Sequence, residues 1–276
     1  MLSGIVVALG FVLLVGGFAW GAWEYRPYTV PTASMTPTID AGDRVLGQRI
    51  SGDEVRRGDV VVFKDRAWGD ETLVKRVVAV GGDKIACCTE GHLTVNGEQI
   101  AEPYLPTDAA HRGTRLPGTV VPKGRLFLLG DERAGSLDST AHLDDVARGS
   151  VPRSAVSARV DAVVFPWRGM LERPSGFAAL PGGISTPGPL RLLLGAVVLG
   201  AVLILVGAAY GPLASRAARR RVARRRWEAV DLLSVNETGS SLRHSRLEGG
   251  YPRQGRRREI VTAWLFLVEG RSNQCP

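Results

Sequence analysis

The sequence has few residues of the kinds that bind metals or form disulfides. It contains 3 cysteines and 4 histidines among 276 residues. Cys87 and Cys88 are adjacent, and neighbouring cysteines rarely pair because the ring between them is strained; no Cys-x-x-Cys spacing occurs. No two histidines have the spacing of metal ligands, the four being His92, His111, His142 and His244. We therefore predict no structural disulfide, no metal site and no cofactor.

Charged residues are missing from two long segments. None occurs from Met1 to Trp23 or from Leu192 to Ser215, and each segment exceeds the roughly 20 residues that cross a bilayer. The first segment lacks the basic start of a cleaved leader, and its apolar run is long. We therefore predict a retained transmembrane anchor at residues 1–23 and a second transmembrane helix at residues 191–213.

The excess of positive charge lies entirely after the second segment. Residues 214–276 contain 14 arginines and 6 acidic residues, a balance equal to the net charge of +8 of the whole chain. Positive segments beside a span stay in the cytoplasm, so we predict a plasma-membrane protein with both termini cytoplasmic and the region between the spans outside. Anionic lipid headgroups are sufficient partners for such an arginine block, and nucleic acid is not expected.

The region between the spans is typical of antiparallel β-structure. Its apolar runs are short, β-prone and bounded by Gly, Asp, Asn or Pro; they are residues 60–63, 73–74, 77–80, 93–95, 126–129 and 162–165. Asn96-Gly97 is the preferred pair of a two-residue hairpin turn. We predict a mainly β, barrel-like extracytoplasmic domain at residues 24–168, with a loop at 108–122. A linker at 169–190 follows, and the basic tail at 214–276 is predicted to be largely disordered.

One serine stands out just after the first span. Ser34 lies between Pro31 and Pro37, with Thr32 two positions before it. A cluster of Ser, Thr and Pro after an apolar segment is commonly a linker, and this alternative stays open for the stretch alone. A serine hydroxyl becomes a good nucleophile only when a neighbouring base takes its proton, and no histidine is near in sequence.

Lys75 is the candidate base. It lies within the apolar run 73–80, where burial would lower its pKa and leave the amine neutral. The alternative is a strand whose lysine faces solvent by simple alternation. A further polar stretch, Gly130–Ser139, carries acidic, basic and hydroxyl groups, and we interpret it as a set of hydrogen-bonding residues that orient the base.

Together these stretches resemble the type I signal peptidases of bacteria, which are membrane-anchored serine proteases with a Ser-Lys dyad. The resemblance extends over about residues 5–168 and rests on four blocks in order: residues 31–38, 57–63, 75–83 and one that begins at Gly130-Asp131. Asn96-Gly97 and residues 102–105 are also similar to the family's connecting segment. The resemblance implies an endopeptidase that removes N-terminal signal peptides from exported proteins.

The resemblance also implies roles for individual residues. Ser34 would attack the scissile carbonyl, and Lys75 would be the general base. The backbone N–H of Ser34 and the hydroxyl of Thr32 would form the oxyanion hole. Four further residues would support the dyad: Arg76 paired with Asp131, Ser136 hydrogen-bonded to the lysine, and Asp138 holding the same loop.

The implied substrates are preproteins that carry signal peptides. Shallow pockets for small side chains would be lined by Tyr28, Val30, Pro31, Met35, Ile39, Val45, Val62 and Val74. Such pockets fit cleavage after an Ala-x-Ala type sequence, which is the small-residue end of a signal peptide. The substrate would bind as an added strand, while the bilayer and its anionic lipids would contact the arginine-rich tail.

Two positions depart from the family's common pattern. Glu132 stands where members commonly have Asn, and Thr140 stands where they commonly have Arg. Loss of the arginine leaves Asp138 with a different partner or with none. The alternative function is therefore a catalytically impaired relative with a binding or regulatory role. A soluble self-cleaving repressor with a similar dyad is disfavoured by the two spans.

Overall fold

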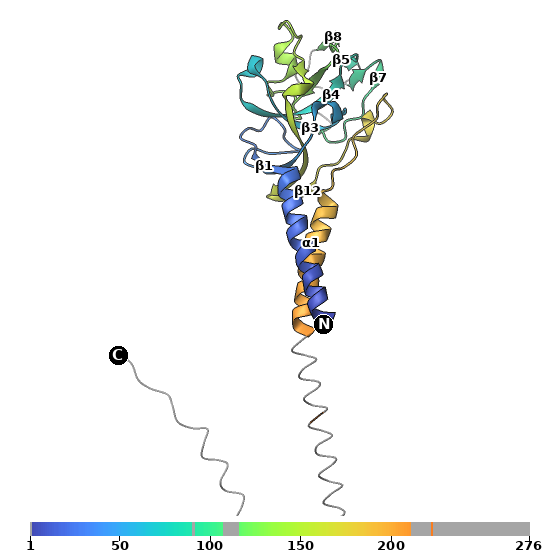
Figure 1. The fold of residues 1–276 in the computed structure, drawn as a ribbon. Helices are drawn as coiled ribbons and strands as arrows, with labels where there is room; N and C mark the ends of the chain where they lie inside the picture. The colour runs from blue at the N-terminus through green and yellow to red at the C-terminus, as the bar shows by residue number, and fades with distance from the viewer. Residues whose placement is uncertain (1, 90–91, 107–115, 211–221, 223–276) are drawn as a thin grey trace, which may run out of the picture. The chain divides into compact units, whose positions relative to one another are not determined.

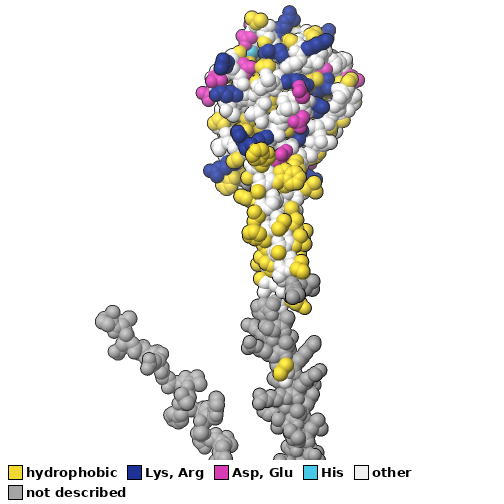
Figure 2. Space-filling model, viewed as in Figure 1, with side chains coloured by type: hydrophobic (Ala, Val, Ile, Leu, Met, Phe, Trp, Pro, Cys, Tyr) yellow, Lys and Arg dark blue, Asp and Glu magenta, His cyan; other side chains and the backbone are white. Residues whose placement is uncertain are grey.

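The computed structural model describes residues 2–89, 92–106, 116–210 and 222 (Figure 1). Two of the described helices are long and apolar enough to cross a membrane: α1 (Leu2–Glu24) and the helix Leu190–Tyr210. They lie side by side against one end of the β domain in Figure 1, and their surface in Figure 2 is almost free of charged side chains. The predicted cytoplasmic tail lies outside the described residues apart from position 222.

Glycines allow the two apolar helices to pack closely. A Cβ built on Gly10 would lie 2.8 Å from the carbonyl oxygen of Gly200, and one on Gly17 would lie 3.1 Å from Val197. Small residues let helix backbones approach each other in lipid, where a hydrophobic driving force between helices is missing. The first and last described helices therefore form one two-helix base for the β domain.

The β domain consists of two antiparallel sheets. The larger has eight strands in the order β1-β2-β11-β3-β4-β9-β10, with β12 paired to β11, and the smaller has four in the order β7-β6-β5-β8. The larger sheet contains β1 (Tyr25–Thr29), β2 (Arg44–Arg49), β3 (Val60–Lys64), β4 (Thr72–Val80), β9 (Arg125–Leu129), β10 (Val151–Pro152), β11 (Val156–Phe165) and β12 (Trp167–Met170). The smaller contains β5 (Lys84–Thr89), β6 (His92–Val95), β7 (Glu98–Gln99) and β8 (Leu116–Val120).

Five short 3-10 helices connect these strands. They are η1 (Gly52–Glu54), η2 (Arg66–Trp68), η3 (Ser139–His142), η4 (Arg153–Ala155) and η5 (Ser175–Phe177). The predicted fold class, mainly antiparallel β with two apolar flanking helices, is confirmed. The predicted hairpin turn is also present, since Asn96 and Gly97 join β6 to β7 with φ angles of 56° and 86°.

The predicted loop at residues 108–122 is wrong in its second half. Residues 116–120 form β8, which pairs with β5, whereas residues 107–115 lie outside the described residues. The segment has little apolar content, but Leu116 and Val121 are 2% and 1% exposed. Backbone pairing with an existing strand and two buried side chains are thus sufficient to form a strand here.

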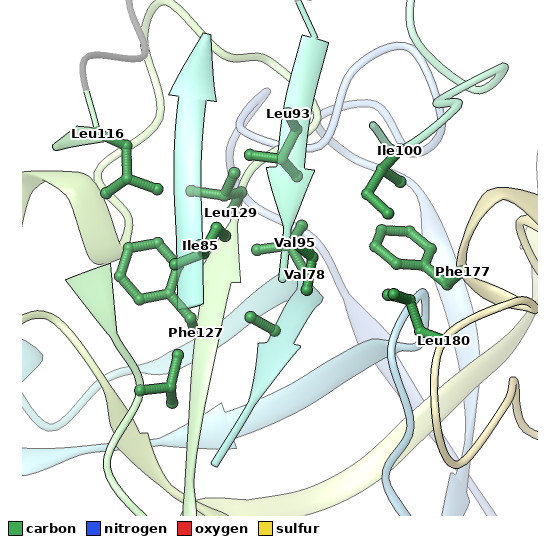
Figure 3. Packing of buried hydrophobic residues seen from close by; sticks show 12 residues of the cluster. Val78, Ile85, Leu93, Val95, Ile100, Leu116, Phe127, Leu129, Phe177 and Leu180 are labelled. Atoms are coloured by element: carbon green, nitrogen blue, oxygen red, sulfur yellow. The ribbon is translucent and has the colours of Figure 1, made fainter. Parts of the chain in front are cut away.

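The largest hydrophobic cluster lies between the two sheets (Figure 3). Val78 and Phe127 of the larger sheet meet Ile85 and Leu93 of the smaller one. Phe177 and Leu180, from the segment that follows β12, complete the same cluster. The Gly-, Pro- and Ser-rich segment between β12 and the second apolar helix is therefore packed onto the domain, and its Phe177 is fully buried.

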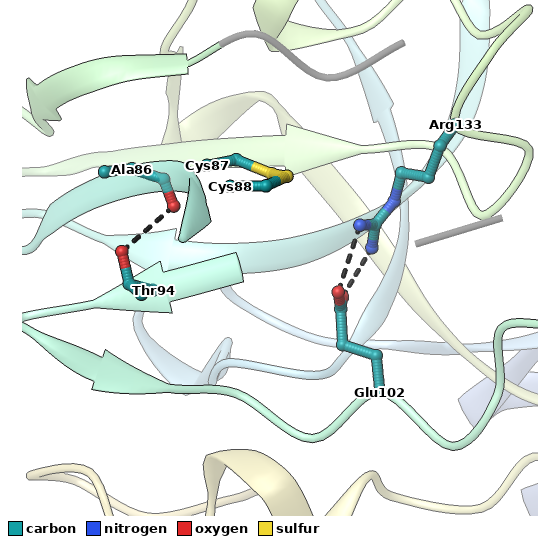
Figure 4. Close-up of a disulfide and its surroundings, with 6 residues drawn as sticks. All are labelled: Ala86, Cys87, Cys88, Thr94, Glu102 and Arg133. Carbon is teal, nitrogen blue, oxygen red and sulfur yellow. Dashed lines mark hydrogen bonds and ion pairs between the residues drawn. A yellow bond between two sulfur atoms is a disulfide. The ribbon is translucent and has the colours of Figure 1, made fainter. Parts of the chain in front are cut away.

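Cys87 and Cys88, on β5, form a disulfide in the structure (Figure 4). The prediction that they would not pair is wrong. That prediction took ring strain as decisive, but bringing adjacent residues together costs almost no loop-closure entropy. Cys87 is half-buried and packs against the cluster between the sheets, whereas Cys88 is exposed.

Candidate active site

Ser34 and Lys75 meet in the folded protein. Lys75 Nζ donates a hydrogen bond to Ser34 Oγ at 2.6 Å, although the residues are 41 positions apart in sequence. Ser34 belongs to the loop between β1 and β2, while Lys75 lies within β4. A serine hydroxyl and an amine within hydrogen-bond distance satisfy the geometric condition for a nucleophile and its base.

Buried apolar residues hold the loop that carries Ser34. Met35 and Ile39 are 0% exposed and form a β-bridge with each other, with the Ile39 N–H donating to the Met35 carbonyl at 2.9 Å. At the base of the loop the Val30 N–H donates to the Asp43 carbonyl at 2.9 Å. Burial of a side chain of this size contributes about 1.5–3 kcal/mol, so the two anchors fix the position of Ser34.

Lys75 is buried with little charge compensation. The residue is 3% exposed, and no ion pair joins it to any acidic group in the described part of the chain. Burial lowers the pKa of the Lys75 amine, and the more distant carboxylates of Asp138 and Asp131 oppose this effect. The lowered pKa shifts the amine toward its neutral form, which is the form that accepts a proton.

Thr32 lies beside the same hydroxyl. Its Oγ1 donates a hydrogen bond to Ser34 Oγ at 3.3 Å, and the Thr32 side chain is exposed. A hydroxyl in this position is close to the point where a carbonyl oxygen would carry negative charge during attack by Ser34.

Arg76 and Asp131 form a buried ion pair next to the dyad. Arg76 Nε and Nη2 donate to the two carboxylate oxygens of Asp131 at 2.8 and 2.7 Å. The Thr38 hydroxyl also donates to Asp131, and Arg76 Nη1 donates to the Gly58 carbonyl at 2.9 Å. The pairing of Arg76 with Asp131, inferred from the resemblance, is thus present in the structure. It holds the loop after β9 against β4.

Asp138 has partners despite the missing arginine. One carboxylate oxygen accepts from the Gly130 N–H at 3.0 Å, and the other accepts from the Thr140 N–H at 3.0 Å and the Thr140 hydroxyl at 2.7 Å. Thr140 is one of the two departures from the family pattern. It therefore gives Asp138 a hydroxyl donor at the position where an arginine donor is common. The second departure, Glu132, accepts from the Gly135 N–H within the same loop.

Ser136 does not make the expected hydrogen bond to Lys75. Its Oγ is buried and has no hydrogen-bond partner among the described residues. The side chain instead packs over Gly130, where an added Cβ would lie 2.1 Å from Ser136 Oγ and 2.5 Å from the Ser34 carbonyl oxygen. Only glycine at position 130 therefore allows Ser136 and the Ser34 carbonyl to lie this close to the backbone.

A second ion pair behind this loop was missed by the sequence reasoning. Arg133 donates to both carboxylate oxygens of Glu102 (Figure 4). Its Nε also donates to the Gly130 carbonyl at 3.0 Å. Tyr104 donates to Glu102, and its ring centre lies 3.8 Å from the Arg76 guanidinium carbon. Burial, and next the Glu102 charge, raise the pKa of the Tyr104 phenol, which stays neutral.

The predicted pocket residues gather beneath the Ser34 loop. Tyr28, half-buried, packs against the cluster, and Pro31 is exposed and outside it. The other six predicted residues are buried members of one hydrophobic cluster: Val30, Met35, Ile39, Val45, Val62 and Val74. The structure brings seven of the eight residues together and leaves Pro31 apart. Among the described residues, no group of three or more His, Cys, Asp or Glu side chains is placed to hold a metal ion.

A serine that is hydrogen-bonded to a buried lysine has the geometry of a serine hydrolase. The two apolar helices at one end of the β domain are those expected of a hydrolase attached to a membrane. The chain matches the family described as signal peptidase, peptidase S26, over residues 1–167. It is 30% identical to signal peptidase I of Mycobacterium tuberculosis over 216 residues, which cover 60% of this chain and 71% of that protein. It is 37% identical to signal peptidase IB of Staphylococcus aureus over 156 residues, covering 50% and 78%.

Among solved structures, a signal peptidase I from Enterococcus faecalis aligns with 43% of this chain and 97% of its own, at 21% identity and a TM-score of 0.29. The match of residues 1–167 covers more than half of the 276 residues. The chain therefore belongs to the signal peptidase family, peptidase S26, and its activity is that of a type I signal peptidase, a serine endopeptidase. Its substrates are preproteins with signal peptides, and two of its described helices are long and apolar enough to cross a membrane.

Proposed function

We propose that Ser34 and Lys75 are the catalytic dyad with which this peptidase cleaves signal peptides. The observation that carries the proposal is the 2.6 Å contact between Ser34 Oγ and the nitrogen of a buried lysine. Neutral Lys75 takes the hydroxyl proton as Ser34 Oγ attacks the scissile carbonyl. The protonated amine then gives this proton to the leaving nitrogen, and an acyl-enzyme on Ser34 remains. Water, deprotonated by Lys75, releases the signal peptide.

The Thr32 hydroxyl and the Ser34 N–H stabilise the oxyanion in this proposal. The 3.3 Å contact between Thr32 Oγ1 and Ser34 Oγ supports the assignment, because it places the donor beside the reacting atom. Loss of one such donor costs about 3 kcal/mol in the transition state. Ser136 is the proposed partner of the protonated lysine, since its buried hydroxyl has no other hydrogen bond among the described residues.

Arg76, Asp131 and Asp138 are positioning residues in the same proposal. Their ion pair and hydrogen bonds hold the loop after β9 beside Ser34, where the Glu132 N–H donates to the Ser34 carbonyl at 3.2 Å. The geometry depends on groups that are all buried and paired, so each of them restricts the movement of the loop.

The proposed cleavage site is an Ala-x-Ala type sequence. In this proposal, the hydrophobic cluster that includes Val30, Met35 and Val74 forms the floor of shallow pockets for small side chains beside Ser34. The extended peptide binds along the strand edges next to the loop, with its backbone hydrogen bonds supplying affinity.

We further propose that residues 24–168 form the catalytic domain on the extracytoplasmic face, between spans at 1–23 and 191–213 that leave both termini in the cytoplasm. Residues 169–190 connect the domain to the second span. The arginine excess of residues 214–276 supports this orientation and a contact of the tail with anionic lipids.

Cleavage of a preprotein by the full-length protein in detergent tests the dyad. We expect Ser34→Ala and Lys75→Ala each to lower the rate by at least about 10³-fold, as for other nucleophile and base deletions. Ser154→Ala and Lys64→Ala, at exposed positions on η4 and β3, are the matched controls and should retain the wild-type rate. Full activity of Lys75→Ala would remove the lysine from the mechanism. Failure of the wild-type protein to cleave any Ala-x-Ala preprotein would remove the function itself.

A further inference from the structure

A cavity lies where the β domain meets the two apolar helices. Its volume is about 520 Å³, and one wall is the segment Ile184–Pro189 that leads into the second helix. The opposite walls carry the side chains of Gln48, Glu54, Arg56 and Arg159. Residues 184–189 lie beyond the part of the chain that matches the signal peptidase family, so this cavity is built by a segment outside that match.

Direct contacts fix the cavity at the ends of both spans. Gln48 Nε2 donates to the carboxylate of Glu24, the last residue of α1, at 2.8 Å. The Leu190 N–H, at the start of the second helix, donates to the Tyr25 hydroxyl at 3.1 Å. With the two helices in a membrane, the cavity is at the depth of the lipid headgroups.

The cavity contains a buried donor that lacks an acceptor. Arg159 is 6% exposed, and its Nη2 donates to Gln48 Oε1 at 2.6 Å. Its Nε makes no hydrogen bond among the described residues, although it forms a long ion pair of 3.5 Å with a carboxylate oxygen of Asp161. A buried guanidinium N–H without an acceptor costs free energy, so an additional acceptor at this position would be stabilising.

Arg56 provides a second guanidinium on the cavity wall. Its Nη1 donates to the carbonyls of Asp53 and Val55, which fixes the group near the chain of η1. Glu54 adds one negative charge at the same wall, and its carboxylate accepts from the Ser51 N–H at 2.9 Å. The residues that line the cavity thus carry a net charge of +1, since Asp161, which pairs with Arg159, lies outside the lining and is shared with Arg173. This charge suits an anion of a single negative charge better than one of two charges.

We propose that this cavity binds the phosphodiester of a membrane phospholipid, with Arg56 and Arg159 as the phosphate ligands. Arginine is well suited to phosphate oxygens because its planar group donates several parallel hydrogen bonds. A phosphodiester carries one negative charge, and a headgroup is the phosphate source that is concentrated at the ends of two spans. Binding there joins the lipid surface to the segment 184–189 and thus fixes the height of the β domain above the membrane.

Native mass spectrometry of the full-length protein in detergent tests the proposal, with dioleoylphosphatidylglycerol as the probe. We expect the wild-type protein to retain one lipid at low lipid excess. Arg56→Gln should lower the affinity by about tenfold, the loss expected for a charge-assisted hydrogen bond. Arg66→Gln, at an exposed arginine on η2, is the matched control and should bind as the wild type does.

Thr186→Trp provides a second test that keeps both arginines, because Thr186 is exposed and lines the cavity. The added ring should fill the cavity and displace the lipid, while thermal unfolding shows whether each variant is folded. Wild-type lipid retention by either folded variant would overturn the proposal. Inorganic phosphate that displaces the lipid from the wild type at equal concentration would assign the site to free phosphate instead. Neither outcome affects the dyad, which is tested separately by cleavage.

Discussion

Two buried polar regions of the β domain differ in whether their charged groups form ion pairs. Near the second helix, Asp161 accepts from the Tyr25 hydroxyl at 3.0 Å and is paired with Arg173, whose side chain is 8% exposed. Beside Ser34, Lys75 is as deeply buried but has no ion-pair partner among the described residues, and burial lowers its pKa. The charged groups around Asp161 are thus paired, whereas the amine without an ion pair is the group that transfers a proton in the proposed mechanism.

The contrast is sharpest between neighbours in the sequence. Arg76 follows Lys75 directly on β4. Arg76 has a bidentate carboxylate partner, whereas the side chain of Lys75 is hydrogen-bonded to the Ser34 hydroxyl. A permanently charged guanidinium requires a counter-charge when buried, whereas an amine can lose its proton instead. The following changes alter one region or the other.

Removal of the charge of Asp161 should have the largest effect on the free energy of unfolding. In Asp161→Asn, the buried guanidinium of Arg173 loses the nearer of its two anionic partners and keeps Asp59 at 3.8 Å, and we expect the free energy of unfolding to fall by roughly 3–5 kcal/mol. Denaturant unfolding of the full-length protein in detergent measures this. Asp70→Asn is the control, because the Lys64–Asp70 pair is 55% and 59% exposed and should contribute less than about 1 kcal/mol. Equal effects of the two substitutions would contradict the structural role of Asp161.

The pH dependence of cleavage should report the titration of Lys75. A base that acts when neutral is inactive below its pKa, and burial lowers the Lys75 pKa from its ordinary value of 10.5. We therefore expect kcat/KM to rise with pH along a limb whose midpoint lies below 10.5, by about tenfold per pH unit under that midpoint. Thr32→Val should lower the rate but keep the midpoint, since it removes no charge. A rate independent of pH would argue against a lysine base.

The sequence was sufficient to single out Ser34 and Lys75, but it did not reveal most of the buried ion pairs and hydrogen bonds elsewhere in the domain. Lys75 inside an apolar run and Ser34 after a span have local patterns, and Asn96-Gly97 specifies its turn by backbone preference. The ion pair of Arg133 with Glu102 has no such pattern, because its partners are 31 positions apart and each is one of many charged residues. The same holds for Tyr25 and Asp161, which are 136 positions apart. Strand β8 depends on pairing with β5 more than on its own composition.

The free-energy cost of burying Lys75 without an ion-pair partner should be measurable as a difference in the free energy of unfolding. Lys75→Met removes the free-energy cost of burying an amine without an ion-pair partner, so we expect a gain of about 1–2 kcal/mol at neutral pH together with loss of cleavage. Because the pKa of Lys75 is lower in the folded than in the unfolded state, the wild-type protein loses stability as pH falls from 10.5 toward the folded pKa. The advantage of Lys75→Met should therefore shrink as pH rises. A destabilised Lys75→Met at every pH would show that the amine is a structural group.

Substitution of Thr140, in the loop after β9, should have the smallest effect on the free energy of unfolding. Thr140 stands where relatives commonly have arginine, and its hydroxyl donates to Asp138 at 2.7 Å while its backbone N–H donates at 3.0 Å. Thr140→Ala removes only the hydroxyl bond, so we expect a loss of about 1 kcal/mol in the free energy of unfolding and little change in kcat. Asp138→Ala removes the partner of the Gly130 N–H as well and should cost more in both measurements. If Thr140→Ala reduced kcat as much as Asp138→Ala, the hydroxyl would be the group that orients the loop. In that case the change from arginine to threonine would have kept the function of the position through a different donor.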